Sequence, residues 1–166
     1  MRLMRRRLII AVTAAVAGGC FKFTQLPKTL EGSPKPTYRG KCPVRLEPLT
    51  TASIEADAQP YAAWQAPDAD LKREMAEVPD EFNRMAKGCD ALAGPSTAAL
   101  KVSVRKAAFT SHKPSTFTYE VTDGTGAVVH AFSYTSELDW NPFIQSRLQA
   151  SYLCSFVSAA CDDKLE

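Results

Sequence analysis

Histidine is scarce in this sequence of 166 residues, which contains only His112 and His130. Neither histidine belongs to an H-x-H or H-E-x-x-H spacing, so we expect no zinc site and no bound metal. His112 lies in a loop-like stretch between Ser111 and Ser115. A hydrolase with dispersed catalytic residues remains a third hypothesis, because triad members can be distant in sequence, but no G-x-S-x-G elbow supports it. His130 falls among alternating apolar residues and is typical of a structural histidine.

Nucleotide-binding and redox motifs are also missing. The sequence has neither G-x-G-x-x-G nor G-x-x-x-x-G-K-[ST], and its five cysteines show no C-x-x-C spacing. We therefore expect no cofactor, and we interpret the protein as a non-enzymatic one.

The N-terminal apolar run, from Leu8 to Ala17, is about half of the roughly 20 residues that a membrane-spanning helix needs. Four arginines precede this run, and small residues follow it. A basic start, a short apolar stretch and small residues are typical of a signal peptide. We predict that residues 1–19 are a signal peptide and that the protein is exported.

Two processing outcomes follow from the residues after the apolar run. Cleavage after Ala15-Val16-Ala17, an A-x-A site, would release a soluble secreted protein. Alternatively, Val16-Ala17-Gly18-Gly19-Cys20 resembles the lipobox of bacterial lipoproteins, although that class prefers leucine where Ala17 stands. The resemblance implies lipidation of Cys20 and a membrane-anchored location in the bacterial cell envelope. Because Phe21 rather than aspartate follows the cysteine, it also implies the outer membrane.

Cysteine pairing favours the lipoprotein interpretation. Lipidation of Cys20 leaves an even set, Cys42, Cys89, Cys154 and Cys161, which predicts two disulfides in an oxidising compartment. Cys154 and Cys161 lie two turns apart on an expected helix, at about 10.5 Å of rise, which exceeds the roughly 7 Å that a disulfide spans. Two pairings remain: Cys42–Cys154 with Cys89–Cys161, or Cys42–Cys161 with Cys89–Cys154.

Charge divides the mature chain into two parts. Residues 20–43 carry five basic side chains and one acidic one, whereas residues 44–166 carry 11 basic and 17 acidic side chains. The acidic domain excludes nucleic-acid binding, which needs a clustered basic surface. We interpret residues 20–43, rich in proline, as a semi-extended tether without regular structure. Its spread lysines favour a solvated spacer over tight binding to anionic lipid.

Residues 44–166 have the size of a single domain. One apolar stripe with 4-3 spacing predicts a helix, which Pro79 should kink or divide; it comprises Leu71, Met75, Val78, Phe82, Met85, Cys89 and Leu92. We interpret Glu74, Glu77 and Glu81, which lie opposite this stripe, as a solvated face rather than catalytic carboxylates.

Alternating residues predict an edge strand over Val44 to Leu49 and three strands near 100–105, 116–122 and 127–134. Asp123-Gly124-Thr125-Gly126 predicts a hairpin turn. Asn141-Pro142 begins a terminal helix that should reach about Cys161. The element order predicts an α+β domain, with a small antiparallel sheet of three to four strands packed by both helices.

Large aromatic side chains, Phe117, Tyr119, Phe132 and Tyr134, should share one sheet face, with Trp140 beyond it. We interpret them as the core under the helices rather than as a binding patch. The leading hypothesis is an accessory or assembly partner of an envelope complex. A carrier of a small molecule or glycan is the second.

Overall fold

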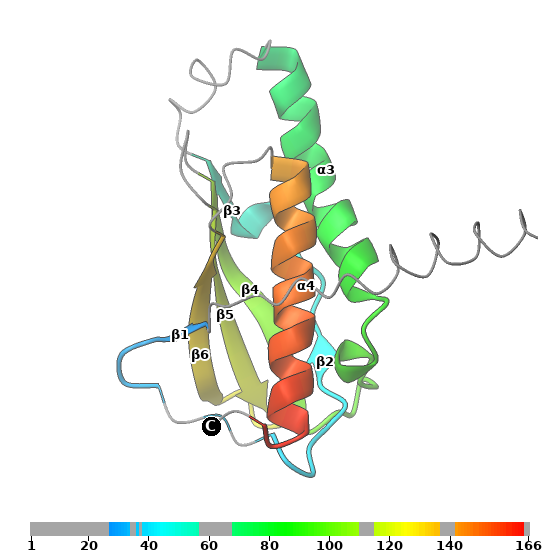
Figure 1. Cartoon of the computed structure of the whole chain (residues 1–166), viewed down its shortest axis with the longest axis vertical. Helices are drawn as coiled ribbons and strands as arrows, with labels where there is room; N and C mark the ends of the chain where they lie inside the picture. Colours follow the sequence, from blue (N-terminus) through cyan, green and yellow to red (C-terminus); the bar gives the residue numbers. More distant parts are fainter. Residues whose placement is uncertain are drawn as a thin grey trace, which may run out of the picture.

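The computed structural model describes residues 27–33, 36, 38–56, 68–109, 115–136 and 142–164. These residues form one mixed β-sheet and two long helices that lie side by side on the same side of it (Figure 1). The sheet order is β1-β6-β5-β4-β2, and the short strand β3 also pairs with β4. The expected α+β class is confirmed.

Three long antiparallel strands form the centre of the sheet: β4 (Leu100–Phe109), β5 (Thr116–Asp123) and β6 (Val128–Thr135). The turn between β5 and β6 is stabilised by Asp123, whose Oδ1 accepts hydrogen bonds from the backbone N–H groups of Thr125 and Ala127. Gly126 closes the turn at a φ of 84°, a conformation that favours glycine. The predicted hairpin is therefore confirmed.

Short edge strands make the sheet larger and more mixed than expected. β2 (Arg45–Leu46) and β3 (Ile54–Ala56) both run parallel to β4, whereas β1 (Lys28–Thr29) runs antiparallel to β6. β2 is the expected edge strand, and Pro48 limits it because proline has no N–H to donate. The expectation that residues 20–43 lack regular structure is wrong for Lys28–Thr29. A two-residue strand has too short an alternating pattern to be recognised in a sequence.

The first long helix, α3 (Asp68–Ala86), continues through Pro79 rather than dividing there. Val78 and Phe82 are both fully buried, so packing on either side of the proline holds the helix together despite the missing hydrogen bond. The chain then turns at Cys89 into a short 3₁₀ helix, η2 (Asp90–Leu92). A second 3₁₀ helix, η1 (Thr51–Ser53), precedes β3.

The second long helix, α4 (Pro142–Cys161), confirms the expected terminal helix. Its expected cap, Asn141, lies outside the described residues, as does Trp140. α4 covers the inner face of the sheet, where the rings of Phe132 and Phe156 lie 4.4 Å apart.

Aromatic side chains from the two central strands build the core. Phe117, Tyr119, Phe132 and Tyr134 are all buried, which confirms their interpretation as core rather than as a binding patch. Phe117 contacts Phe82 of α3, and the ring of Tyr119 stacks on that of Phe132 at 5.0 Å. Both helices are therefore fixed on the sheet by ring packing.

Two disulfides staple α4 to the rest of the domain, as expected. Cys42 pairs with Cys161, and Cys89 pairs with Cys154, which is one of the two pairings left open by the sequence. The first bond links α4 to the segment before β2. The second links α4 to the chain just after α3.

Candidate functional site

The segment before β2, residues 27–43, is called the strap, and its described residues, 27–33, 36 and 38–43, lie along the domain. Tyr38 is the one buried side chain among the strap residues that the structure describes, with 1% of its surface exposed. Its hydroxyl group lies 3.0 Å from Nδ1 of His130, and its ring meets the edge of Phe156. A residue expected in a spacer is thus inserted into the core.

His130 lies beneath this tyrosine on the inner face of β6 and is 0% exposed. Its ring stacks on Phe132 at 5.2 Å. Burial lowers the pKa of His130, because a charged ring loses the solvation of water. Nε2 of His130 has no hydrogen-bond partner within the described part of the chain, whereas Nδ1 contacts the hydroxyl of Tyr38. The ring therefore lies in the core, as its place among alternating apolar residues predicts.

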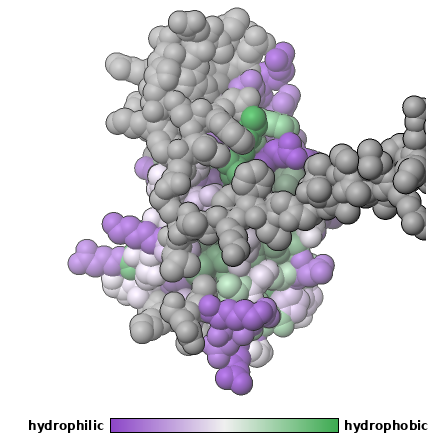
Figure 2. Space-filling model, in the orientation of Figure 1, coloured by the Kyte–Doolittle hydropathy of each residue, from purple (hydrophilic) through white to green (hydrophobic). Residues whose placement is uncertain are grey.

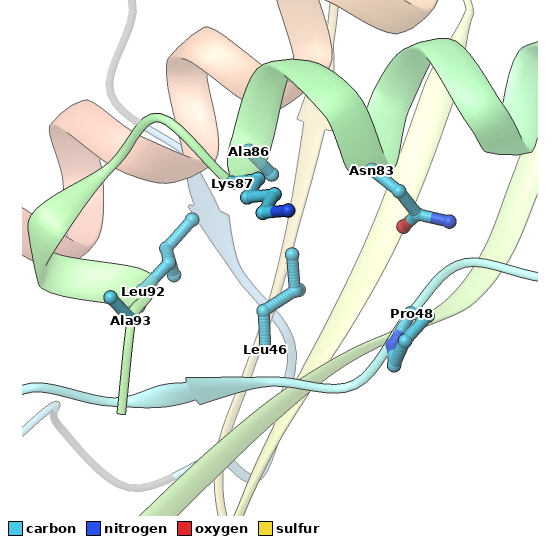
Figure 3. A pocket seen from close by; sticks show the side chains of 7 residues that line it. All are labelled: Leu46, Pro48, Asn83, Ala86, Lys87, Leu92 and Ala93. Atoms are coloured by element: carbon cyan, nitrogen blue, oxygen red, sulfur yellow. The ribbon is translucent and has the colours of Figure 1, made fainter. Parts of the chain in front are cut away.

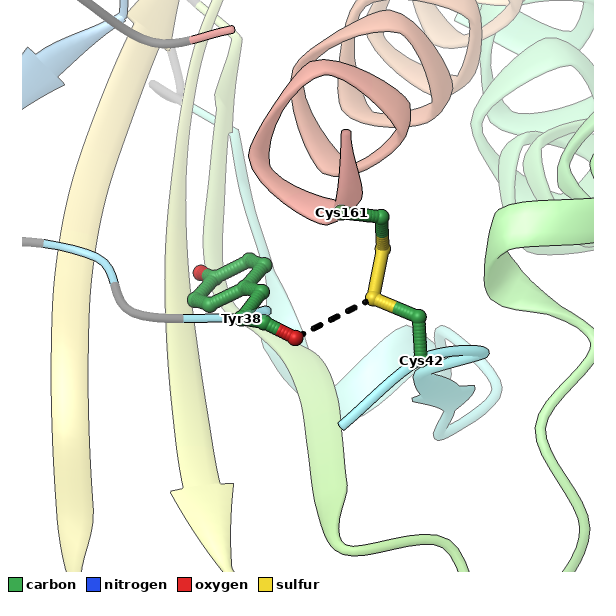
Figure 4. Close-up of a disulfide and its surroundings, with 3 residues drawn as sticks. All are labelled: Tyr38, Cys42 and Cys161. Carbon is green, nitrogen blue, oxygen red and sulfur yellow. Dashed lines mark hydrogen bonds between the residues drawn. A yellow bond between two sulfur atoms is a disulfide. The ribbon is translucent and has the colours of Figure 1, made fainter. Parts of the chain in front are cut away.

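The strap ends at the disulfide between Cys42 and Cys161 (Figure 4). The carbonyl oxygen of Tyr38 lies 3.5 Å from Sγ of Cys42. Outside it, the exposed side chains of Arg39 and Asp163 form an ion pair at 3.4 Å. Figure 2 shows hydrophilic side chains projecting at the lower end of the molecule, where α4 ends in Figure 1.

An open hollow lies beside the disulfide, with a volume of about 490 Å³. Its lining consists of Cys42, Pro43, Asp90, Ala91, Ser158, Cys161 and Asp162. The disulfide is thus part of the wall of a surface hollow.

A separate apolar groove of about 290 Å³ lies between the end of α3, β2 and η2 (Figure 3). Its lining consists of Leu46, Pro48, Asn83, Ala86, Lys87, Leu92 and Ala93. The amide of Asn83 is already engaged, because it bonds both the N–H and the C=O of Leu49 at 2.8 and 2.9 Å. Lys87 is exposed and is the charged residue of the lining. The groove can accept an apolar group that carries a negative charge beside it.

Two buried glutamines of α4 connect the helix to the ends of the central strands. Oε1 of Gln145 accepts a hydrogen bond from the N–H of Ser115 at 2.7 Å. Gln149 donates to the carbonyl oxygen of Tyr134 at 3.1 Å and accepts from the hydroxyl of Tyr119 at 3.0 Å. Such a paired network fixes the position of a helix, and the periodicity of the sequence gave no signal for it.

Ser115, one of the two serines beside His112, is fully buried within this network. Ser111 and His112 themselves lie outside the described residues. The polar contact of His130 is the hydroxyl of Tyr38 rather than a serine. Among the described residues, Ser115 thus contacts Gln149 and His130 contacts Tyr38.

The expectation that Glu81 belongs to a solvated face is wrong. Its side chain is 7% exposed and lies between Arg84, at 2.6 Å, and Arg147 of α4, at 3.1 Å. A hydrogen bond from Arg84 is the main cause that lowers the pKa of Glu81, and the charges of both arginines add to it. The partner on α4 lies 66 residues away, so the helical pattern alone gave no sign of this contact. Glu77 is exposed as expected, and Glu74 is half-buried.

The parts of the chain that the structure describes hold no group of three or more histidine, cysteine or acidic residues placed to bind a metal ion. Within the same ranges, no helix combines the length and apolar character needed to cross a bilayer. Cys20 and the predicted signal peptide lie outside the described residues.

Comparisons with known proteins give one distant similarity. No family model matches the chain, and no curated protein matches it. Among solved structures, the chain is similar to a PelC variant from Paraburkholderia phytofirmans, which is described as a dodecamer. The two chains share 17% sequence identity over 79% of this chain and 97% of that chain, with a TM-score of 0.35.

Proposed function

We propose that this chain is a lipid-anchored envelope protein without enzymatic activity, which serves as an accessory or assembly partner of an envelope complex. Its apolar surface groove is the observation that carries the proposal. The other support comes from its two disulfides, which are typical of exported proteins in oxidising compartments.

Lipidation of Cys20 would hold the domain close to a membrane. The strap begins at residue 27, so six residues separate it from Cys20. An extended chain spans at most about 3.5 Å per residue, which limits the distance between Cys20 and the strap to about 25 Å. The proposed location is the outer membrane, with the domain facing the periplasm or the cell surface. A secreted soluble form, cleaved after Ala17, is the alternative.

The groove suits one apolar side chain of a protein partner. Its lining is mostly apolar, formed by Leu46, Pro48, Leu92 and two alanines, and the ammonium group of Lys87 complements an acidic neighbour of that side chain. Pockets that bury drug-sized ligands have volumes of about 300–1,000 Å³. At about 290 Å³, the groove falls just below that range and fits a single side chain better than a carried molecule.

Site-specific photocrosslinking in the native host tests this function. A photoreactive phenylalanine replaces Ala93 in the groove or, as the matched control, exposed Glu77 on α3. We expect a discrete crosslinked protein from position 93 only, and its loss when Leu46→Asp is added. Equal crosslinking from both positions, or none from position 93, would contradict the proposal. A co-purified small molecule displaced by Leu46→Asp would replace it with the carrier function.

A further inference from the structure

The two disulfides differ in access to solvent. Cys42 is exposed and Cys161 is half-buried, and both line the open hollow of about 490 Å³. Cys89 is 5% exposed and belongs to the hydrophobic core cluster, and its partner Cys154 is half-buried against that cluster. Thiol–disulfide exchange requires a thiolate to reach a sulfur atom, so access determines which bond reacts first. Access favours the bond between Cys42 and Cys161.

The strap has few other ties to the domain. Its strand β1 contains two residues, and the next backbone contact is the N–H of Leu30 bonded to the carbonyl oxygen of Ala131 at 3.0 Å. The hydroxyl of Ser33 accepts a hydrogen bond from the N–H of Ala131, the ring of Tyr38 is buried against His130, and exposed Arg39 pairs with Asp163. Segments with few buried contacts open locally well before the rest of a domain. The covalent bond to Cys161 therefore restrains the strap together with the buried ring of Tyr38.

The bond between Cys89 and Cys154 has a different role, because it joins elements that already pack together. α3 and α4 lie side by side over part of their lengths (Figure 1), and η2 also contacts α4. Opening the bond between Cys89 and Cys154 would leave these contacts in place. Opening the bond between Cys42 and Cys161 removes the strap's only covalent link to α4 in the part of the chain that the structure describes.

We propose that the Cys42–Cys161 disulfide is a thiol–disulfide exchange site and that its reduction by a dithiol, small or protein-borne, releases the strap. The thiolate of the dithiol attacks one sulfur atom, the S–S bond breaks, and a mixed disulfide forms while the departing cysteine takes up a proton. The second thiol of the dithiol then attacks the mixed disulfide. Two electrons pass from the dithiol, which becomes a disulfide, to Cys42 and Cys161, which become thiols.

Release would change how far the domain extends from a membrane, a consequence that rests on the proposed lipidation of Cys20. With the bond closed, six residues connect Cys20 to the strap. With the strap detached, the connection extends to Val44 and its limit rises from about 25 Å to about 85 Å. Departure of Tyr38 would also open the space above His130 and Phe156. The exchange site thus controls both reach and access to the aromatic core.

Timed reduction of the purified full chain tests the exchange site. The protein is treated with dithiothreitol without denaturant, samples are quenched with iodoacetamide, and peptide mass spectrometry measures the labelling of each cysteine. We expect Cys42 and Cys161 to be labelled at least tenfold faster than Cys89 and Cys154. Equal rates, or faster labelling of Cys89 and Cys154, would overturn the proposal.

Limited trypsin digestion tests the release of the strap. In the variant Cys42→Ser with Cys161→Ser, we expect cleavage at Arg39 and Lys41 to accelerate at least tenfold over the oxidised protein, with cleavage at exposed Lys87 unchanged. Unchanged cleavage at Arg39 and Lys41 would overturn the role of the disulfide as the strap's restraint. If this variant does not fold, the reduced wild-type protein is digested instead. Both measurements are repeated with Cys20→Ser, so they stand or fall independently of lipidation.

Discussion

The two disulfides of this domain close loops of different length and stabilise different kinds of structure. The bond between Cys89 and Cys154 spans 65 residues and lies beside the packed helices, whereas the bond between Cys42 and Cys161 spans 119 residues and holds a lightly packed strap. Chain entropy alone would make the longer loop slightly more stabilising. The structure indicates that the bond between Cys42 and Cys161 stabilises the fold less. Breaking it frees the strap in the folded state as well, and this gain offsets part of the entropy gained by the unfolded chain. Packing around each disulfide therefore matters more here than loop length.

Removal of each disulfide separately tests this comparison and gives the largest expected effect. We expect Cys89→Ala with Cys154→Ala to lower the free energy of unfolding by about 4 kcal/mol, and Cys42→Ala with Cys161→Ala to lower it by only about 2 kcal/mol. Urea denaturation monitored by circular dichroism measures both. A larger loss from the exposed pair would show that loop length outweighs packing.

Truncation of the strap's buried side chain should have the next largest effect. Tyr38→Ala removes a ring that is 1% exposed and leaves a cavity above His130, so we expect a loss of about 3 kcal/mol. Tyr38→Phe keeps the ring and removes the hydroxyl that contacts Nδ1, for which we expect a loss of about 1 kcal/mol. Equal losses from the two variants would contradict the packing role of the ring. Chemical denaturation of both proteins measures the difference.

Neutralising the buried carboxylate between the helices should have a smaller effect. Glu81→Gln removes the charge that faces Arg84 and Arg147, and we expect a loss of about 1 kcal/mol because both arginines are largely exposed. The control is Glu77→Gln on the exposed face, which we expect to change stability by less than about 0.5 kcal/mol. If Glu81→Gln leaves stability unchanged, the ion pair between Glu81 and Arg147 does not help to hold α4 in place.

The smallest expected effect is on the pH dependence of stability. It arises from His130, which contacts Tyr38 of the strap. Burial lowers the pKa of His130 below the ordinary value of 6.5. The unfolded state therefore takes up a proton more readily, so this contribution to stability is complete above about pH 6.5 and is lost as the pH falls below it. His130→Leu should flatten the stability profile between about pH 7 and pH 5. A profile unchanged by that substitution would show that His130 is solvated. Urea midpoints across this range provide the measurement.

Elements with strong local patterns were predictable from the sequence. Alternation gave β4, β5 and β6, the Asp123–Gly126 turn gave the hairpin, and the spacing of Val78 and Phe82 gave the buried face of α3. Helix geometry also reduced the disulfide pairings to two, because Cys154 and Cys161 lie on one helix.

Features that depend on distant partners were not predictable. Tyr38 meets His130 across 92 residues, and no local pattern marks either of them as a partner of the other. The parallel strand β2 is two residues long, which is too short for alternation to reveal its direction. Gln145 and Gln149 looked like ordinary polar residues of a helix, although both are buried against the ends of β5 and β6. In each case the feature is set by a partner that lies far away in the sequence.

The proposed anchor at Cys20 is tested most directly by intact-mass analysis of the protein extracted from host membranes under non-reducing conditions. We expect residues 1–19 to be absent, acyl mass to be attached to Cys20, and the four remaining cysteines to carry two disulfides. Cys20→Ser should abolish the acyl mass and release the protein from the membrane. An unmodified N-terminus at Gly18 would contradict the lipid anchor.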